Sequence, residues 1–189
     1  WDGDQGGRNL YQAIRDCNIF LENVENVDKV FDLDPFERDK WIAEVKFLKA
    51  YYHFFLLRMY GPIIVIDKNL PITASIEETR RFRQPIDETV TYISGLLTEA
   101  AAGLPDNVQS RNTELGRVTK PIALSIKARL LMMAASPLFN GNPDFTNFKG
   151  PDGKLLFNPT HDPAKWEIAA AACKEAIDVC TRAGIKLYE

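Results

Sequence analysis

The 189-residue sequence has only three cysteines and two histidines, and no apolar run in it approaches the length of a membrane span. A spanning helix needs about 20 consecutive apolar residues. Zinc sites need close pairs of cysteine or histidine, and the two histidines are isolated from each other. Cys17, Cys173 and Cys180 are best interpreted as buried free thiols. We therefore predict no metal site, no disulfide framework and no membrane-spanning helix.

Neither sign of charge is in large excess. The chain has 23 basic and 26 acidic side chains, which gives a formal net charge of -3 and argues against a protein that binds nucleic acid by neutralising phosphates. Its 46% hydrophobic and 26% charged residues are ordinary for a globular protein. A chain of this length can bury roughly 70% of its unfolded surface, so it needs no metal to fold. We expect a folded domain with no nucleic-acid partner.

Recognisable catalytic and nucleotide-binding motifs are also missing. The glycines of residues 3–7 follow no strand, and residues 150–154 lack the Ser or Thr of a phosphate loop. The adjacent carboxylates Glu77 and Glu78 would point about 100° apart on a helix, which does not suit paired acid and base groups. No serine has a histidine close to it in the sequence. We predict that the protein is not an enzyme and uses no cofactor.

Helical periodicity dominates what is present. Apolar residues recur at spacings of three and four in five segments. The second segment has the clearest boundaries, because Asp34 and Pro35 are typical of a helix start, and Gly61 and Pro62 are typical of a helix end. The predicted helices cover residues 9–24, 35–60, 85–103, 119–136 and 163–183.

These helices predict an all-α fold, a helical bundle of tetratricopeptide-like helix pairs with long irregular connections, in one domain over residues 1–189. For the second helix we expect the buried stripe to include Trp41 and Met59. For the last helix we expect a buried face that includes Trp166, Cys173 and Ile177. Residues 67–84 read as an extended crossing segment rather than a domain linker.

Two segments combine aromatic rings with short polar side chains, a mixture that suits sugar rings or peptides. The first is the long loop over residues 137–162, which includes Phe139, Asn140 and Asn142. Its phenylalanines could instead pin the loop to the helices beneath it, and we favour this structural role. The second is Trp1 with the neighbouring acids Asp2 and Asp4, for which terminal disorder is the alternative.

Several segments, in order, resemble the SusD/RagB family of Bacteroidota outer-membrane lipoproteins. The resemblance covers nearly the whole chain, and one motif alone would be weak evidence. The segments that carry it are residues 11–22, 43–54, 60–63, 104–105, 116–120, 127–130, 134–142 and 166–188.

The resemblance implies a lipid-anchored nutrient-binding protein, exposed on the cell surface at the outer membrane. Such proteins have tetratricopeptide-like helix pairs, cap a SusC-like TonB-dependent transporter and deliver oligosaccharides, or in some members peptides. Members are several hundred residues long, so this chain is expected to be an N-terminal or central part, without the lipid anchor that would be its only membrane attachment. A helical-repeat protein-interaction module and a peptide-cargo binder are the alternative functions.

The resemblance also orders the candidate ligand-binding residues. In the family a ligand-facing aromatic tends to precede the first of these helices, so Trp1 with Asp2 and Asp4 is the first candidate. Phe139, Asn140 and Asn142 come next. Binding would rest on aromatic faces stacked against sugar C–H groups and on polar side chains bonded to hydroxyls, with no chemistry on the ligand.

Overall fold

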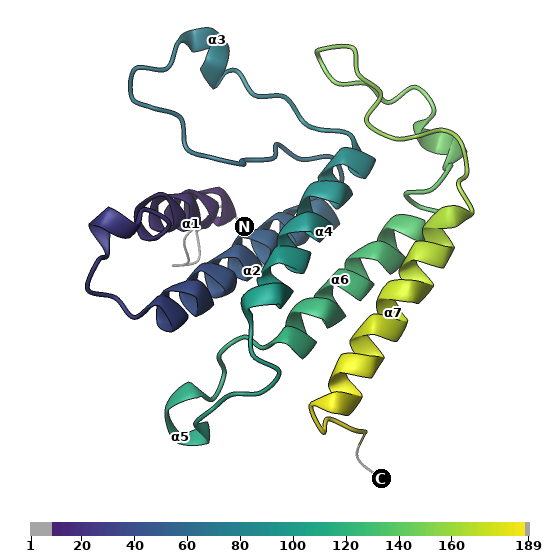
Figure 1. The fold of residues 1–189 in the computed structure, drawn as a ribbon. Helices are drawn as coiled ribbons and strands as arrows, with labels where there is room; N and C mark the ends of the chain where they lie inside the picture. The colour runs from purple at the N-terminus through teal and green to yellow at the C-terminus, as the bar shows by residue number, and fades with distance from the viewer. Residues whose placement is uncertain (1–8, 188–189) are drawn as a thin grey trace.

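The computed structural model describes residues 9–187. Within them the fold is all-α, with no strand, and the predicted five long helices are confirmed (Figure 1). Two short helices, α3 and α5, and two 3-10 turns lie in the connections. The long helices are α1 (Leu10–Val24), α2 (Pro35–Tyr60), α4 (Ile86–Gly103), α6 (Lys120–Ala135) and α7 (Ala164–Arg182); the short elements are α3 (Ile76–Thr79), α5 (Arg111–Glu114), Val27–Lys29 and Pro143–Phe145.

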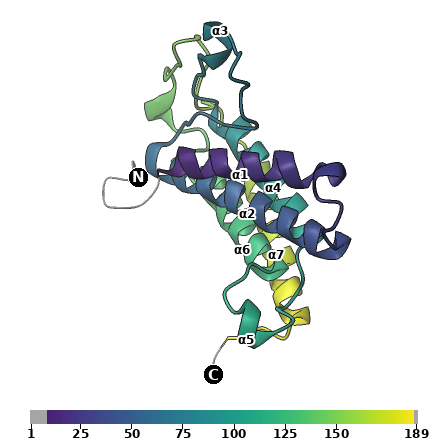
Figure 2. The ribbon, with the colours of Figure 1, turned by 90° about the vertical axis from the view of Figure 1, so that its left-hand side faces the viewer.

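The long helices form a row in which each packs mainly against the next one along the chain. α1 packs on α2, α2 on α4, α4 on α6, and α6 on α7 (Figures 1 and 2). This order of contacts is typical of helical-repeat proteins, in which each unit buries its apolar face against its sequence neighbours. The connections that join α2 to α4 and α6 to α7 therefore lie at the same end of the row (Figure 1).

The boundaries of α2 follow from its end residues. The side chain of Asp34 accepts hydrogen bonds from the backbone N–H groups of Phe36 and Glu37, both at 3.0 Å. The helix ends at Gly61, whose φ of 69° is easily reached only by glycine. α7 begins after Pro163, which is its N-cap, and the Asp162 carboxylate accepts the N–H of Ala164 at 2.9 Å.

The predicted buried stripe of α2 is wrong at two positions, since Trp41 is 36% and Met59 is 43% exposed. The helix instead buries a different face, which combines two alanines with phenylalanine and leucine side chains. Ala43 lies so close to Gly103 of α4 that a Cβ added at Gly103 would approach the Ala43 Cβ to 2.9 Å. Small side chains allow this close approach of α2 and α4, and larger residues on other faces remain partly exposed. The apolar residues that α2 buries are Ala43, Phe47, Ala50, Phe54, Leu56 and Leu57.

The predicted face of α7 is also partly wrong. Trp166 and Ile177 are exposed, at 47% and 61%, and Cys173 is half-buried. Within residues 9–187 α7 packs mainly against α6, so it buries one narrow stripe made mostly of alanine. That stripe consists of Ala169, Ala172, Ala176 and Val179.

Candidate functional site

The irregular segments gather at one end of the helix row, where residues 61–85 and 136–163 lie over the ends of the helices (Figure 1). The first of these segments runs extended without a strand partner, so its backbone groups need other hydrogen-bond partners. Its base is closed by the N–H of Gln84, which donates to the carbonyl of Ile63 at 2.8 Å. The crossing segment predicted for residues 67–84 is therefore part of a loop that returns to its starting point.

Side chains of the helices supply the remaining partners of the segment. The hydroxyl of Tyr11 on α1 donates to the carbonyl of Ile64 at 3.3 Å. The hydroxyl of Tyr92 on α4 donates to the carbonyl of Ile66 at 3.4 Å. The ammonium of Lys49 on α2 donates to the carbonyl of Asp67 at 2.6 Å. Three helices thus hold the backbone of one loop.

His53 of α2 is fully buried beneath the segment and is a fourth partner. Its Nε2 accepts the N–H of Ile66 at 3.2 Å, and its Nδ1 lies 2.8 Å from the carbonyl of Lys49. An acceptor Nε2 places the ring proton on Nδ1, so the ring is neutral. Burial lowers the pKa of His53 to about 4. His53, one of the two histidines of the sequence, is therefore a structural residue.

A groove of about 500 Å³ runs between α1 and this segment, and we call it the α1 groove. Its polar lining contains three cations and two neutral side chains, and Tyr11 supplies the aromatic ring. The amide of Asn69 donates to the carbonyl of Arg15 at 3.3 Å and so ties the two walls together. The lining residues are Tyr11, Arg15, Ile64, Ile66, Lys68, Asn69, Leu70, Thr79 and Arg81.

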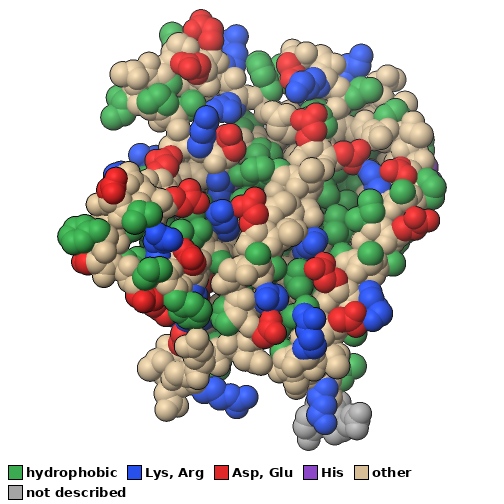
Figure 3. All heavy atoms as spheres, in the orientation of Figure 1, with side chains coloured by type: hydrophobic (Ala, Val, Ile, Leu, Met, Phe, Trp, Pro, Cys, Tyr) green, Lys and Arg blue, Asp and Glu red, His purple; other side chains and the backbone are tan. Residues whose placement is uncertain are grey.

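A smaller groove of about 270 Å³ lies on the other side of the same segment. Arg81 lines it as well, but here two carboxylates, of Asp67 and Glu88, share the lining with it. The two sides of one segment therefore differ in charge. In Figure 3 several basic side chains lie around this part of the molecule, below the loop that contains α3.

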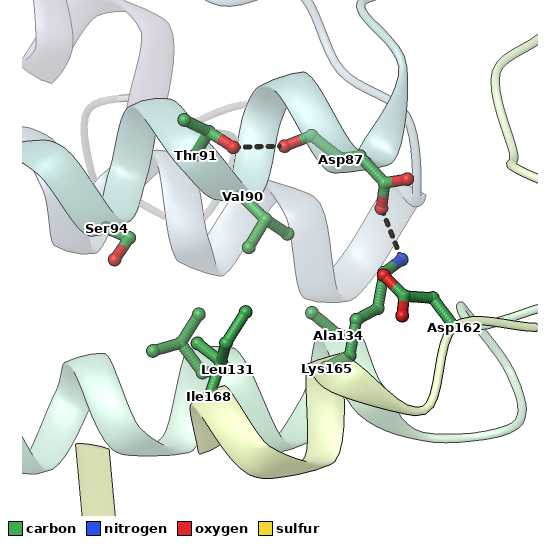
Figure 4. Close-up of a pocket in the computed structure, with 9 residues that line it drawn as sticks. All are labelled: Asp87, Val90, Thr91, Ser94, Leu131, Ala134, Asp162, Lys165 and Ile168. Atoms are coloured by element: carbon green, nitrogen blue, oxygen red, sulfur yellow. Dashed lines mark hydrogen bonds and ion pairs between the residues drawn. The ribbon is translucent and has the colours of Figure 1, made fainter. Parts of the chain in front are cut away.

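Another hollow lies among α4, α6 and α7, with a volume of about 400 Å³. Its apolar lining comes from all three helices, and the Lys165 ammonium bridges α7 to the carboxylate of Asp87 on α4 at 2.6 Å (Figure 4). Figure 3 shows hydrophobic side chains in the hollow between these helices. No aromatic ring lines it. The lining residues are Asp87, Val90, Thr91, Ser94, Leu131, Ala134, Asp162, Lys165 and Ile168.

The long loop after α6 has a small aromatic core of its own. Phe157 is its centre: its ring stacks on Phe145 with centroids 4.3 Å apart and on Phe139 with centroids 6.2 Å apart. Phe148 meets Phe157 edge-on at 5.9 Å. Phe139 and Phe157 are both buried, so the phenylalanines pin the loop to the helices beneath it, as the structural interpretation predicts.

Asn140 closes the same loop. Only 3% exposed, it donates from Nδ2 to the carbonyl of Asp162 and accepts the N–H of Asp162 at Oδ1, both at 2.8 Å. Next to it Gly141 has a φ of 73°, and a Cβ there would lie 2.6 Å from the backbone nitrogen of His161. Asn142 accepts the N–H of Asp144 at 2.9 Å and so caps the 3-10 turn.

The structure thus brings Phe139, Asn140 and Asn142 together, with the first two buried and bonded within the loop. The other three candidates, Trp1, Asp2 and Asp4, lie outside the described residues. Sequence reasoning missed the α1 groove, because its walls come from three separate stretches of the chain.

Several charged side chains at the opposite end of the row form ion pairs. The guanidinium of Arg117 donates to both carboxylate oxygens of Glu44, at 2.8 and 2.9 Å. The Glu114 carboxylate binds the buried ammonium of Lys40 and accepts the N–H groups of Gln109 and Ser110. These contacts, the Lys40 bond first, lower the pKa of Glu114 to about 2. They fasten the connection around α5 to α2. In residues 9–187 no group of three or more potential ligands could hold a metal ion.

The model of a family described as "Starch-binding associating with outer membrane" matches residues 8–132, about two thirds of the chain. The chain belongs to this SusD-like family. In the part of the chain that is described, no helix is both long enough and apolar enough to cross a membrane.

Solved structures place the SusD-like chain in the same fold. The protein named BT4246 is 43% identical, with a TM-score of 0.80 over 93% of this chain. A SusD-like protein from Bacteroides fragilis, BF3747, is 23% identical, with a TM-score of 0.65 over 90% of this chain. A structure described as a complex with xylogluco-oligosaccharide is 21% identical, with a TM-score of 0.67 over 99% of this chain.

The chain spans only a part of these SusD-like relatives, namely 30% of BT4246, 26% of BF3747 and 30% of the xylogluco-oligosaccharide complex. Among curated proteins no sequence matches it.

Proposed function

We propose that the protein of which this chain is a part binds oligosaccharides at the cell surface without cleaving them, and passes them to a SusC-like TonB-dependent transporter. The observation that carries the proposal is the match of residues 8–132 to the starch-binding, outer-membrane-associated family. One protein of the same fold was solved with xylogluco-oligosaccharide, which fits this class of ligand. Attachment to the outer membrane by a lipid anchor is part of the proposal.

The end of the row that contains the two irregular segments supports this function physically. A rigid helical frame positions loops whose side chains can recognise a ligand. The α1 groove offers the ring of Tyr11 for stacking, and amide, hydroxyl and cationic groups for hydrogen bonds to sugar oxygens. We keep Trp1 with Asp2 and Asp4 as proposed ligand contacts, in the eight residues of sequence that precede the described part. Phe139, Asn140 and Asn142 are proposed to act mainly by shaping the neighbouring loop.

The proposal is tested with the full-length natural protein and a panel of plant and host oligosaccharides. Ligand-induced thermal shift reports binding, and release of new reducing ends reports cleavage. We expect stabilisation by one class of glycan and no new reducing ends. Shifts with peptides only would favour peptide cargo, and product release would show that the protein is an enzyme.

The Trp1 assignment has a matched control in the same chain. Trp166 is an exposed tryptophan on α7, far along the sequence from residue 1 and not among the residues that line the α1 groove. We expect Trp1→Ala to weaken binding of the glycan found in the panel, and Trp166→Ala to leave it unchanged. Equal affinity of the wild type and Trp1→Ala would remove Trp1 from the site.

A second candidate function, protein docking, is favoured by the turn between α1 and α2. Phe31 is 84% exposed there, and Val27 and Phe36 are more than half exposed. Exposed apolar side chains so close together in the sequence are available for contact with another protein. We expect Phe31→Ser to reduce co-purification of the full-length protein with the transporter and to leave glycan affinity unchanged. Undiminished co-purification would exclude this turn as the docking surface.

A further inference from the structure

Every charged side chain that lines the α1 groove is a cation. Arg15 projects from α1, Lys68 from the outgoing limb of the 61–85 segment and Arg81 from its returning limb, so three separate stretches place positive charge around one groove. No carboxylate lines it. The chain as a whole is slightly acidic, with a net charge of -3, so this concentration of cations does not follow from composition.

Within the described residues these cations make no ion pair at contact distance, although Arg81 lies near enough to Glu78 to help lower the pKa of its carboxyl. Among residues 9–187 no ion pair and no side-chain hydrogen bond engages Arg15, Lys68 or Arg81, whereas Arg117, Lys40 and Lys165 are all paired. The acid nearest to Arg81 in the turn of α3 is Glu78, whose carboxylate already accepts the N–H of Ser75 at 2.7 Å. All three cations are exposed to solvent and available to a ligand.

Neutral and acidic sugars form hydrogen bonds with different kinds of side chain. Hydroxyl groups both donate and accept, so sites for neutral sugars need acceptors such as carboxylates among their polar groups. Arginine and lysine can only donate, and the guanidinium fork matches the two oxygens of an oxyanion. In the α1 groove the side chains of Asn69 and Thr79 are the neutral polar groups, and every charged one is a donor.

We propose that the α1 groove binds a sugar that carries an oxyanion, with Arg15, Lys68 and Arg81 as its charge partners and Tyr11 against the ring of the sugar. This inference rests on the proposed function and names the ligand class of one part of the site. Its volume of about 500 Å³ suits one or two sugar units. The smaller groove on the other side of the segment, which contains Asp67 and Glu88, lacks this selectivity.

The test uses the full-length protein and pairs of oligosaccharides that differ only in charge. Oligogalacturonate and its methyl ester test a carboxylate, and a sulfated galactan oligosaccharide and its desulfated form test a sulfate ester. We expect calorimetry to detect binding of at least one acidic member and at least about tenfold weaker binding of its neutral counterpart. The affinity is expected to fall as salt rises from 50 to 500 mM, because screening weakens contacts between exposed charges.

Two single-residue variants then test whether the acidic glycan binds in the α1 groove. Arg15→Gln is expected to weaken the acidic glycan about tenfold or more, since it removes a charge-assisted contact. The matched control is Arg129→Gln, which removes an exposed and unpaired arginine from the described part of α6 and should leave affinity unchanged. If the α1 groove is not the site, both variants will bind equally well, which would overturn the inference.

The outcomes also distinguish failure of the acidic-sugar proposal from failure of the proposed glycan binding on which it rests. Binding of neutral oligosaccharides, with equal or weaker binding of the acidic ones, would overturn the inference and support glycan binding. No response to any glycan, charged or neutral, would overturn both. Binding of the acidic member of one pair, but not of its neutral counterpart, and loss of that binding in Arg15→Gln would support both the inference and the proposed function. The pair that binds would show whether the oxyanion is a carboxylate or a sulfate.

Discussion

Residues 61–85 and residues 136–163 both connect helices at the same end of the row, yet different groups hold them. Side chains of α1, α2 and α4 bind the backbone of the first segment, through Tyr11, His53 and Tyr92 among others. The second loop is held by its own residues, through the rings around Phe157 and the two bonds of Asn140.

The difference matters for recognition. A loop that packs its own side chains inward has fewer of them left for a ligand. A loop whose backbone is bound from outside can direct its side chains to solvent, as Lys68 and Arg81 do. This contrast is why we propose the first segment, and not the second, as a ligand surface. Four perturbations test the contrast.

The largest effect is expected from Phe157→Ala, which removes the centre of the aromatic core of the second loop. A buried phenylalanine replaced by alanine costs about 3–5 kcal/mol of unfolding free energy. Guanidinium unfolding of the full-length protein measures this loss. Phe148→Ala is the control, because that ring is 38% exposed and should cost clearly less. Equal losses would show that the loop does not depend on its core.

Acid should loosen the first segment through His53. Its pKa is about 4 in the folded protein and 6.5 when exposed, so between these values the unfolded chain binds a proton that the folded chain does not. Stability is therefore full above pH 6.5 and falls as the pH drops towards 4, by about 3 kcal/mol at most.

Unfolding free energies at pH 7 and pH 4.5, compared between the wild type and His53→Gln, measure this effect. The loss between the two pH values should shrink in the variant. Glu114 cannot mimic the result, because its lowered pKa of about 2 makes its contribution fall only below pH 4.5. An unchanged pH dependence in His53→Gln would contradict the assigned role.

Asn140→Ala should cost about 1–3 kcal/mol, since it leaves the backbone N–H and carbonyl of Asp162 without their buried partner. Asn142→Ala provides the comparison, because it removes the cap of a short and exposed turn. The same unfolding measurement should rank Asn140→Ala as the more damaging of the two. The reverse order would mean that the loop is closed elsewhere.

The smallest expected effect is that of Tyr11→Phe, which removes the hydroxyl bonded to Ile64 and keeps the ring. One such hydrogen bond contributes about 0.5–1.5 kcal/mol. Thermal unfolding should register this small loss, and glycan affinity should stay the same because the ring remains in the α1 groove. A large loss of affinity would show that the hydroxyl itself contacts the ligand.

Much of the fold could be predicted from the sequence, because helix ends carry local signals. Asp34, Pro35 and Gly61 mark α2 by chemistry that depends on no other part of the chain. The buried faces of α2 and α7 could not be predicted from local signals of this kind. Alanines make up most of the buried stripe of α7 and part of the buried face of α2, and the large residues Trp41 and Trp166 remain exposed.

The site was harder to predict for a related reason. The structural role of Phe139 follows from aromatic residues that are close in sequence, whereas the α1 groove joins Arg15 to Lys68 and Arg81, which are more than fifty positions away. One signal was available: residues 80–83, Arg-Arg-Phe-Arg, concentrate charge in a segment with no helical pattern. The candidates Trp1, Asp2 and Asp4 stay a prediction.

The way in which helices bind the 61–85 backbone has a consequence for how this scaffold can change. Its hydrogen bonds use backbone carbonyls and one N–H, which every ordinary residue provides. The side chains at positions 68 and 81 take no part in these hydrogen bonds, so both can be exchanged while the loop keeps them. If the α1 groove binds the sugar as proposed, exchanges at these positions would change which sugar is bound and leave the helical frame intact.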